Sequence, residues 1–324
     1  MKKTALVSWL ILSILSVVTA QQTVDPRWTQ AISNAPFTPR FNPATVVFKN
    51  KLWVIGGRLY NGQDTRDIWS SADGKTWDRV TDAAACLPRQ SHTALVFNNK
   101  LWVIAGATQK GSPIFYSRSD VWNSADGITW EKVTDSAAFP SRVNFASQVF
   151  NGKMWVLGGE NTGTVGRALG DVWYSEDGST WTLANTAAFT PRVFPQSVVY
   201  QNKIWILGGH NLNAVLKDIS SSPDGINWTT AQGVTGFNPA DHFLLAAVFN
   251  SQVWVHDQYT VSNTSDMIHW NTVTTTGPYA KLGLLEMNPK LWSIGTLTLG
   301  TTNLHPVYYY APAGTGLPKT TGSK

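Results

Sequence analysis

Arginine recurs at one position of a repeated sequence, and its spacing could build an anion-binding site. Each of these arginines lies eight residues before an aromatic residue that closes a short apolar stretch. The arginines are Arg40, Arg89, Arg142 and Arg192, and the aromatic residues are Phe48, Phe97, Phe150 and Tyr200. The same slot holds Asp241 and Tyr279 further along the chain. Because a guanidinium group binds carboxylate or sulfate in a bidentate fork, a ring of arginines would suit an anionic ligand such as an acidic sugar.

A structural role for these arginines is the alternative. Four aspartates recur with equal regularity, each ten residues before a tryptophan: Asp67, Asp120, Asp171 and Asp218. Pairs between the two sets would tie neighbouring repeats together and leave no charge for a ligand. Asp241 in the fifth slot indicates that the ring is not purely anion-binding. The sequence leaves both interpretations open.

Catalytic chemistry has one candidate pair, Asp241 and the adjacent His242, which could act as general acid and base. The six histidines show no His-x3-His spacing of metal ligands, and no Gly-x-Ser-x-Gly elbow presents a serine nucleophile. A single cysteine, Cys86, excludes a disulfide framework and a Cys-based zinc cluster. We therefore expect no metal and no cofactor, and a binding protein rather than an enzyme.

The candidate residues sit in a repeat of about fifty residues, and such a period indicates a solenoid or a propeller. Residues 46–57 read VVFKNKLWVIGG, and copies start at Ala94, Gln148, Val198, Ala247 and Leu285. Each copy has two short apolar stretches around a polar turn, which predicts a β-hairpin. The tryptophan of the second stretch falls at positions 53, 102, 155, 205, 254 and 292.

A second strand pair follows each hairpin. Its turn carries Asp73-Gly74 in the first repeat, four residues before Trp77, and the same Asp-Gly pair recurs at positions 126, 177 and 224. Asp266 keeps the spacing, but Met267 replaces the glycine. Asp-Gly is a strong tight-turn signal, because the turn needs a positive φ that glycine adopts cheaply. Each repeat is therefore predicted to be four antiparallel strands, here called a to d in chain order.

The ends of the chain predict how the repeats close. Six strand-b tryptophans are present, but only five strand-d tryptophans follow them, the last being Trp270. Trp28 precedes Arg40 by twelve residues, as Trp77 precedes Arg89, so residues 26–32 are expected to be the missing strand d. Pairing this segment with the strand near 305–310 would close a ring and remove exposed sheet edges. We predict an all-β, six-bladed β-propeller of four-stranded antiparallel blades, closed by an N-terminal strand.

The repeats resemble the kelch-repeat family of β-propellers, of the secreted, galactose-oxidase-like kind. The resemblance rests on the paired glycines, the Asp-(Ile/Val)-Trp segments and the strand-d tryptophans, and it covers residues 26–312. It implies the propeller fold and leaves function open, since the family includes binding modules, a sialic-acid mutarotase and galactose oxidase. The copper site of galactose oxidase needs a tyrosine crosslinked to a cysteine, and only Cys86 could serve here.

A binding face follows from the propeller geometry. Strand a is the innermost strand, so the arginine slot lies near the mouth of the central channel, on the side of the b–c and d–a loops. The gaps between the last glycine and the strand-c aspartate are 10, 14, 12 and 9 residues. Loops that vary on a constant scaffold usually carry recognition. The loop aromatics Tyr60, Phe115, Tyr116 and Tyr259 are candidates for a sugar-binding platform.

The ends of the sequence indicate secretion. Residues 1–20 combine Lys2 and Lys3, an apolar run and small residues before Gln21, which is the layout of a cleaved signal peptide. The propeller is expected over 21–312 and a flexible tail over 313–324. Without residues 1–20 the formal charge falls from +5 to +3. We expect a secreted, extracellular or periplasmic protein that is a monomer, with no nucleic-acid partner and no membrane insertion after cleavage.

Three functions are compatible with this sequence. The first is a secreted, non-enzymatic module that binds an extracellular protein or glycan. The second is a carbohydrate-active enzyme similar to the sialic-acid mutarotase, for which His242 or Asp241 should be indispensable. The third is a structural component of an extracellular matrix. Asn227 and Asn263 match the glycan-acceptor pattern, and Asn263 is the better candidate because Asn227 directly precedes a core tryptophan.

Overall fold

The computed structural model describes residues 25–109, 116–162, 167–211, 214–239, 244–257, 260–274, 282–299 and 302–311. The predicted signal peptide (1–20) and tail (313–324) lie outside these ranges. The described residues form strands, turns and loops. They include no helix with the length and hydropathy that a bilayer crossing needs.

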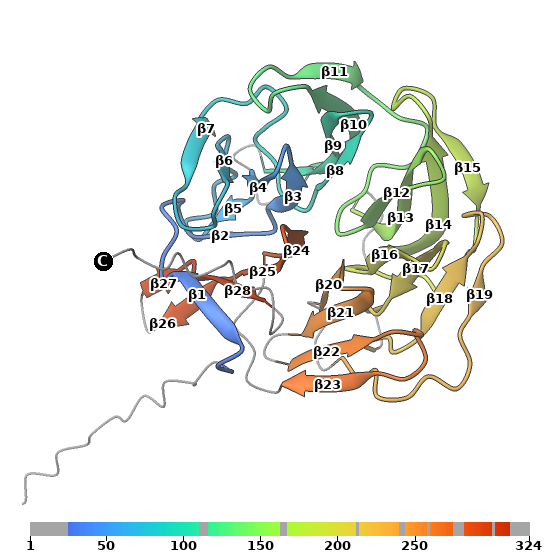
Figure 1. Cartoon of the computed structure of the whole chain (residues 1–324). Coiled ribbons are helices and arrows are strands. Elements are labelled where there is room, and N and C mark those ends of the chain that lie inside the picture. Colours follow the sequence, from blue (N-terminus) through green and yellow to red (C-terminus); the bar gives the residue numbers. More distant parts are fainter. Residues whose placement is uncertain are drawn as a thin grey trace, which may run out of the picture.

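Six four-stranded antiparallel sheets surround a central channel, as blades of a propeller (Figure 1). Blade 1 contains β3 (Ala44–Phe48), β4 (Lys51–Ile55), β6 (Ile68–Ser71) and β7 (Asp78–Thr81). Blade 2 contains β8 (Thr93–Phe97), β9 (Lys100–Thr108), β10 (Tyr116–Ser124) and β11 (Glu131–Thr134). Blade 3 contains β12 (Ala146–Phe150), β13 (Lys153–Asn161), β14 (Arg167–Ser175) and β15 (Thr182–Asn185). These four strands are strands a to d of each repeat.

The remaining blades keep this order until the last one. Blade 4 contains β16 (Gln196–Tyr200), β17 (Lys203–Leu207), β18 (Ile219–Ser222) and β19 (Thr229–Thr230). Blade 5 contains β20 (Leu244–Phe249), β21 (Gln252–Asp257), β22 (Thr260–Thr264) and β23 (Asn271–Thr274). Blade 6 contains β24 (Gly283–Met287), β25 (Lys290–Ile294), β28 (Val307–Tyr310) and β1 (Trp28–Ile32).

The N-terminal strand completes the last blade. β1 runs antiparallel to β28, with Trp28 opposite Tyr310 and Gln30 opposite Tyr308. The two segments lie side by side at the outer edge of blade 6 (Figure 1). The predicted six-bladed ring, and its closure by the segment around Trp28, are therefore confirmed.

Each blade packs against the next through its strand-b tryptophan. The indole Nε1 of Trp53 donates to the carbonyl of Phe48 at 2.9 Å, which fixes the ring on its own blade. The ring then joins a buried cluster with Ile55, Leu101 and Val103, where β4 of blade 1 meets β9 of blade 2. The hydrophobic core is thus divided into layers between blades, as expected for a sheet whose two faces are both covered.

The Asp-Gly turns form because the aspartate caps them. Asp73 Oδ1 accepts hydrogen bonds from the backbone N–H groups of Lys75 (2.8 Å) and Thr76 (2.7 Å). The hydroxyl of Ser71 accepts from the N–H of Gly74 at 2.8 Å. The same pattern recurs in blades 2 to 5. Met267 holds a φ of 66° at the glycine position of blade 5, so these contacts stabilise the turn even without glycine.

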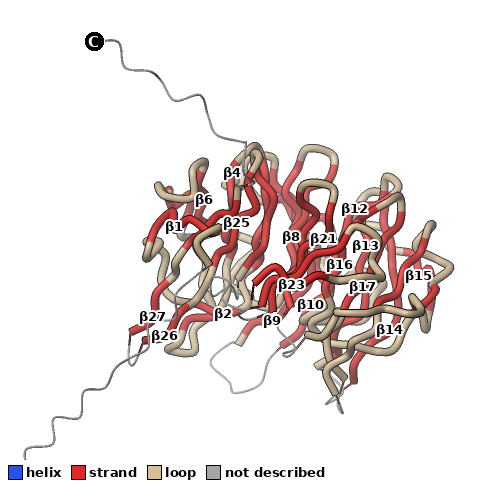
Figure 2. Tube along the Cα trace, turned by 60° about the horizontal axis from the view of Figure 1, so that its bottom comes forward, coloured by secondary structure: helices blue, strands red, loops and turns tan. Residues whose placement is uncertain are grey.

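Several b–c connections contain additional β-structure. In blades 2 and 3, where the sequence gaps are longest, strands b and c reach nine residues each. Blade 1 adds the two-stranded pairing of β2 (Arg40–Phe41) with β5 (Arg58–Leu59). Blade 6 adds a hairpin of β26 (Leu297–Leu299) and β27 (Thr302–Leu304). β2, β26 and β27 lie on the same side of the ring (Figure 2).

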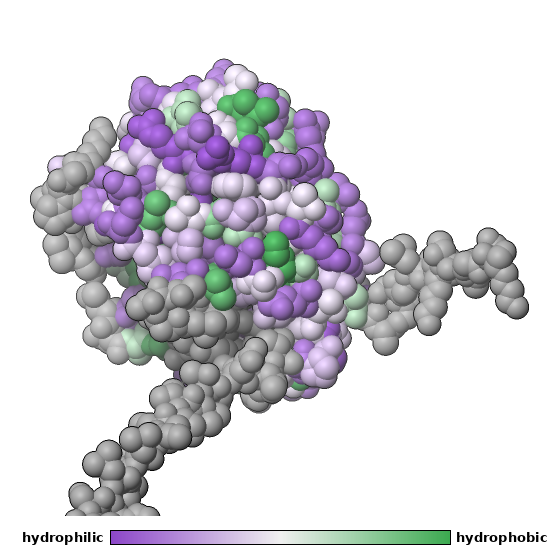
Figure 3. Space-filling view, turned by 90° about the vertical axis from the view of Figure 1, so that its left-hand side faces the viewer, coloured by the Kyte–Doolittle hydropathy of each residue, from purple (hydrophilic) through white to green (hydrophobic). Residues whose placement is uncertain are grey.

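The part of the outer rim that carries β1 and β7 is predominantly polar. A space-filling view of the side carrying β1 and β7 shows hydrophilic residues with only small, separate hydrophobic patches (Figure 3). Scattered exposed apolar residues are normal on a soluble surface and mark no site by themselves. A binding site is therefore expected in the channel or on the loops around its mouth.

Candidate functional site

The central channel has a volume of about 600 Å³ and is lined by the innermost strands β3, β8, β12, β16, β20 and β24. Most of its lining side chains are small or apolar. Among the described lining residues the one carboxylate is Glu286, near the end of β24. It lies beside the a–b turn, and therefore at the end of the channel away from the d–a loops.

A collar of backbone hydrogen bonds runs around part of the other end, from blade 1 to blade 4. The N–H of Ser91 donates to the carbonyl of Asn42 (3.0 Å), Asn144 to Ser91 (3.2 Å), and Phe194 to Asn144 (2.8 Å). All four residues have positive φ values between 46° and 53°, and each lies two residues after a repeated arginine. The collar passes from blade to blade through blades 1 to 4 and holds the d–a loops in a fixed arrangement.

The four repeated arginines are almost completely buried, with exposed fractions of 0 or 1%. Each donates to one of the four regularly spaced aspartates that the sequence offers as structural partners. All but Arg192 bind both carboxylate oxygens. The shortest distances are 2.7 Å for Arg40–Asp67, 2.8 Å for Arg89–Asp120, 2.9 Å for Arg142–Asp171 and 2.5 Å for Arg192–Asp218. The structure therefore places these guanidinium groups inside the blades, and it presents none of them to a ligand in the channel.

The remaining contacts of these arginines explain their spacing. Arg142 Nη1 also donates to the carbonyl of Gly158, which lies within strand b of its own blade (2.9 Å). The backbone carbonyl of Arg142 accepts from the N–H of Gly106 in the preceding blade (3.0 Å). The side chain thus connects the segment before strand a to strands b and c of the same blade, and the backbone connects two blades. We call this unit of arginine, aspartate and glycine carbonyl the blade tie.

The electrostatics of the ties favour the ionised pair. Burial alone would raise the pKa of Asp67, but the hydrogen bonds and charge of Arg40 outweigh it, and the pKa lies below its usual value. The pKa of Asp120 is lowered in the same way by Arg89. A buried guanidinium with most of its donors used inside the blade has little left for a ligand. The ligand-binding prediction requires exposed guanidinium groups. The structure exposes none of the four, which are Arg40, Arg89, Arg142 and Arg192.

Exposed aromatic residues gather on the b–c and d–a loops instead. Phe41 is 42% exposed and Tyr60 41%, and their ring centroids lie 4.2 Å apart. Tyr116, at the start of β10, is 51% exposed. Tyr60 and Tyr116 are among the predicted platform residues, whereas Phe41 was not predicted from the sequence. The other two platform candidates, Phe115 and Tyr259, lie outside the described residues.

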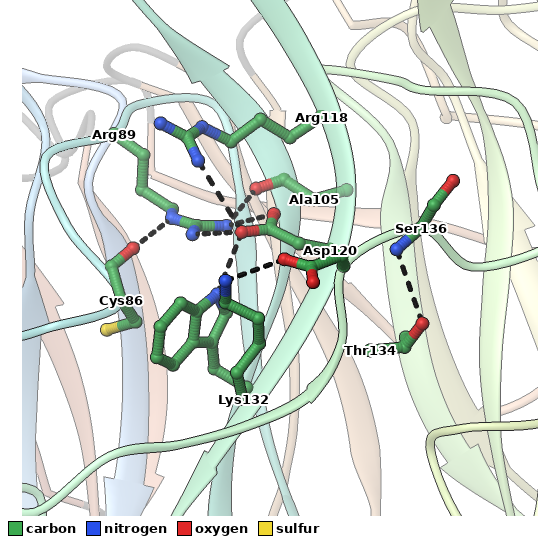
Figure 4. A network of polar contacts seen from close by, with 10 residues as sticks. Cys86, Arg89, Ala105, Arg118, Asp120, Lys132, Thr134 and Ser136 are labelled. Carbon is green, nitrogen blue, oxygen red and sulfur yellow. Dashed lines mark hydrogen bonds and ion pairs between the residues drawn. The ribbon is translucent and has the colours of Figure 1, made fainter.

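Arginine is present on this face, but outside the repeated slot. Arg58, in β5, contacts Asp64 at 3.4 Å and donates to the side chain of Gln109 in blade 2. Arg118, in β10, contacts Asp120 at 3.5 Å (Figure 4). Burial lowers the pKa of Arg118, and the nearby charge of Arg89 lowers it further. Sequence reasoning missed both residues, because neither recurs with the repeat.

The acid–base pair predicted in the fifth slot, Asp241 and His242, lies outside the described residues. Blade 5 departs from the tie pattern in a further way, because the buried His256 and Asp257 occupy the end of strand b. Of the glycan-acceptor candidates, Asn227 is exposed at a turn and Asn263 is partly buried in β22. Within the described ranges, no three His, Cys, Asp or Glu side chains are arranged to hold a metal ion.

The fold and the repeated ties define a β-propeller of the kelch type. The family of the KLHDC2/KLHL20/DRC7 Kelch-repeats domain matches residues 43–256, so the chain belongs to the kelch-repeat family. Among solved structures it is similar to that of YjhT, with a TM-score of 0.69 and 14% sequence identity over 86% of this chain and 96% of that one. At that identity the likeness concerns the fold alone. No curated protein matches the sequence.

Proposed function

We propose that this protein is a secreted, non-enzymatic binding module that holds a glycan or a protein partner on the face of its b–c and d–a loops. The observation that carries the proposal is the group of exposed aromatic side chains on that face, Phe41, Tyr60 and Tyr116. Aromatic rings supply large, rigid contact area and are enriched at interfaces.

The fixed scaffold beneath these loops supports the same proposal. The hydrogen bonds of the blade ties and the backbone collar hold the bases of the loops in place. The polar groups that form these bonds are not available to a ligand. The b–c connections above them differ in length and form between blades. Recognition by variable loops on a rigid scaffold is a common division of labour.

The proposal is tested by a glycan array and a secreted-protein display screen, each probed with the purified protein and two double variants. Tyr60→Ala/Tyr116→Ala removes two rings of the proposed face and should weaken binding at least tenfold. Ile128→Ala/Ile226→Ala removes exposed side chains (57% and 45%) from c–d turns on the opposite side, and should leave binding within twofold. Equal losses from both variants, or a loss from the second alone, would refute the proposed face.

Secretion is tested independently of any ligand. Expression of the full chain in a host with a secretory pathway should yield a mature protein in the medium or periplasm whose first residue is Gln21. A protein retained in the cytoplasm with an intact N-terminus would contradict the signal-peptide assignment.

The enzymatic alternative gives a different readout. A mutarotase-like enzyme would accelerate the interconversion of sugar anomers, which one-dimensional NMR follows directly. Asp241→Asn and His242→Ala would abolish that acceleration, whereas a binding module should tolerate both changes.

A further inference from the structure

Blade 2 carries one arginine more than its blade tie needs. Two residues before the tie aspartate, the other three tied blades have an uncharged residue: Thr65, Leu169 and Leu216. Blade 2 has Arg118 at this position. Arg89 already donates to both carboxylate oxygens of Asp120, at 2.9 and 2.8 Å, and the indole of Trp122 adds a third bond at 2.8 Å. Arg118 is therefore surplus to the tie.

The hydrogen-bonding capacity of Arg118 is largely unused. Its contact with Asp120, at 3.5 Å, is longer than the bonds from Arg89, and its Nε–H is buried without an acceptor. The rest of the guanidinium points away from the Asp120 carboxylate (Figure 4). The side chain is 31% exposed, so a ligand can reach it from solvent. A buried donor without a partner is rare in folded proteins, and it shows that the contacts within the blade do not saturate Arg118.

Two further groups share the surface of Arg118. Side chains alternate along a strand, so Tyr116 and Arg118 lie on the same face of β10. Thr108 is paired directly opposite Tyr116 and lies on this face too. Its hydroxyl is buried and has no hydrogen-bond partner. This face of blade 2 therefore combines a cation, an unused hydroxyl and an exposed aromatic ring.

The neighbouring loop of blade 1 continues this surface. Gln109 follows β9 and donates its backbone N–H to Asp64 at 2.7 Å, while its side chain accepts from Arg58. Asp64 is buried and also attracts Arg118 electrostatically. Two residues after Arg58, Tyr60 contacts Phe41. This cluster thus contains three guanidinium groups (Arg58, Arg89 and Arg118) and two carboxylates (Asp64 and Asp120). These five described side chains together carry one excess positive charge.

We propose that Arg118 is the anion-binding residue of the loop face, and that its ligand is an acidic oligosaccharide. In this arrangement the carboxylate of a uronic acid pairs with the guanidinium of Arg118. An adjoining sugar ring packs on Tyr116 or on the Phe41–Tyr60 pair. A pyranose has apolar C–H faces and a polar rim, which suits a face that offers exposed aromatic rings beside a guanidinium group. The inference rests on the proposed function and names the ligand class of the same face.

The test is a calorimetric titration of the purified protein with trigalacturonic acid, its neutral methyl ester and tetraglutamate. Arg118→Leu installs the residue that blades 3 and 4 carry at this position and so preserves the local packing. It should weaken binding of trigalacturonate at least tenfold, because a charge-assisted pair is lost. Arg66→Ala, which removes an exposed arginine of equal charge, should change the affinity less than twofold. The methyl ester should bind the unaltered protein as weakly as the acid binds the Arg118→Leu variant.

Three results would overturn the inference. They are equal affinities of the unaltered protein and Arg118→Leu for the acid, a preference for tetraglutamate over trigalacturonate, and no binding of trigalacturonate at all. Each leaves the proposed function to be judged separately, since the Tyr60→Ala/Tyr116→Ala variant still reports on neutral glycans and protein partners. Failure of that variant to affect any ligand would refute the face itself.

Discussion

The indole of Trp53 in blade 1 lies directly against Gly127 in the turn of blade 2. A Cβ atom added to Gly127 would lie 2.4 Å from Cζ3 of this ring. The same relationship joins Trp102 to Gly178, Trp155 to Gly225, and Trp292 to Gly74. The glycine of each Asp-Gly turn is therefore needed twice, once for its positive φ and once for the space that the neighbouring tryptophan occupies.

Substitution of Gly127 by alanine should lower stability by about 3 kcal/mol, because it combines a left-handed conformation with an overpacked interface. Gly152 is a matched control, since its φ of +70° resembles the +79° of Gly127 but no atom lies within 4 Å of an added Cβ. Gly152→Ala should cost only about 1 kcal/mol. Thermal unfolding compares the two variants, and similar losses in both would contradict the packing role of Gly127.

Loss of the Trp28 side chain should loosen the closure of the ring. Trp28 is 5% exposed and packs on His256 and Tyr310, with centroid distances of 6.2 and 5.7 Å. Trp28→Ala should cost about 3–5 kcal/mol, as truncation of a buried aromatic does. Amide hydrogen exchange in β28 should accelerate strongly, whereas the exposed Thr29→Ala in the same strand should change it little. Unchanged protection of β28 in Trp28→Ala would show that the closure does not depend on this ring.

Ser293 is a site where stability should rise. It is fully buried in β25, and its hydroxyl has no hydrogen-bond partner. Other blades hold Val54, Val103, Val156, Ile206 and Val255 at this position. Ser293→Val should stabilise the protein by about 1–2 kcal/mol, because an unpaired buried polar group is replaced by an apolar one. Ser220→Val is the contrasting control and should destabilise, since the Ser220 hydroxyl contacts that of Thr230 at 3.0 Å. Melting temperatures that fall in both variants would contradict this account.

Acid should weaken the seam between blade 6 and blade 1. His305 is fully buried there: its Nε2 accepts from the backbone N–H of Arg40 at 3.1 Å, and its Nδ1 lies 2.9 Å from the carbonyl of Gly295. Burial lowers the pKa of His305 to about 4, and the charge of Arg40 lowers it too. The unfolded chain then binds more protons than the folded one below its ordinary pKa of about 6.5.

Stability should therefore be fully present above pH 6.5 and should fall as the pH drops toward 4, by about 3 kcal/mol from His305. His92, whose pKa is lowered by burial to about 3, adds a fall of the same sign in this range. Melting temperatures between pH 7 and 4.5 measure the effect. His305→Gln should lower the melting temperature at pH 7 and reduce its slope with pH. An identical slope in the variant would assign the pH dependence to other groups.

The architecture could be predicted from the sequence because it repeats. Trp28 revealed the displaced strand, since the count of strand-d tryptophans was one short, and its register with Tyr310 confirms that inference. The b–c connections could not be predicted in this way. Among the described residues, the added hairpin of β26 and β27 occurs in blade 6 alone, and a feature present once leaves no period in the sequence.

The candidate site, too, could be predicted from the sequence only where its residues repeat. The regular spacing of Arg142 and Asp171 indicated a possible pair, but it could not show that Gly158 supplies a further acceptor and that the guanidinium is buried. Arg118 was missed because it belongs to one blade only. The signal that could have found it is a comparison of repeats two residues before the strand-c aspartate, where arginine stands beside threonine and two leucines.

The central claim is a division of labour between two kinds of arginine: the four in the blade ties maintain the fold, and Arg118 serves recognition. The most direct measurement is the melting temperature of Arg142→Leu beside that of Arg118→Leu, without any ligand. Arg142→Leu leaves Asp171 partly buried without its partner and should lose about 3–5 kcal/mol, whereas Arg118→Leu should match or exceed the unaltered protein. A large loss in Arg118→Leu, or an unchanged melting temperature in Arg142→Leu, would contradict the account.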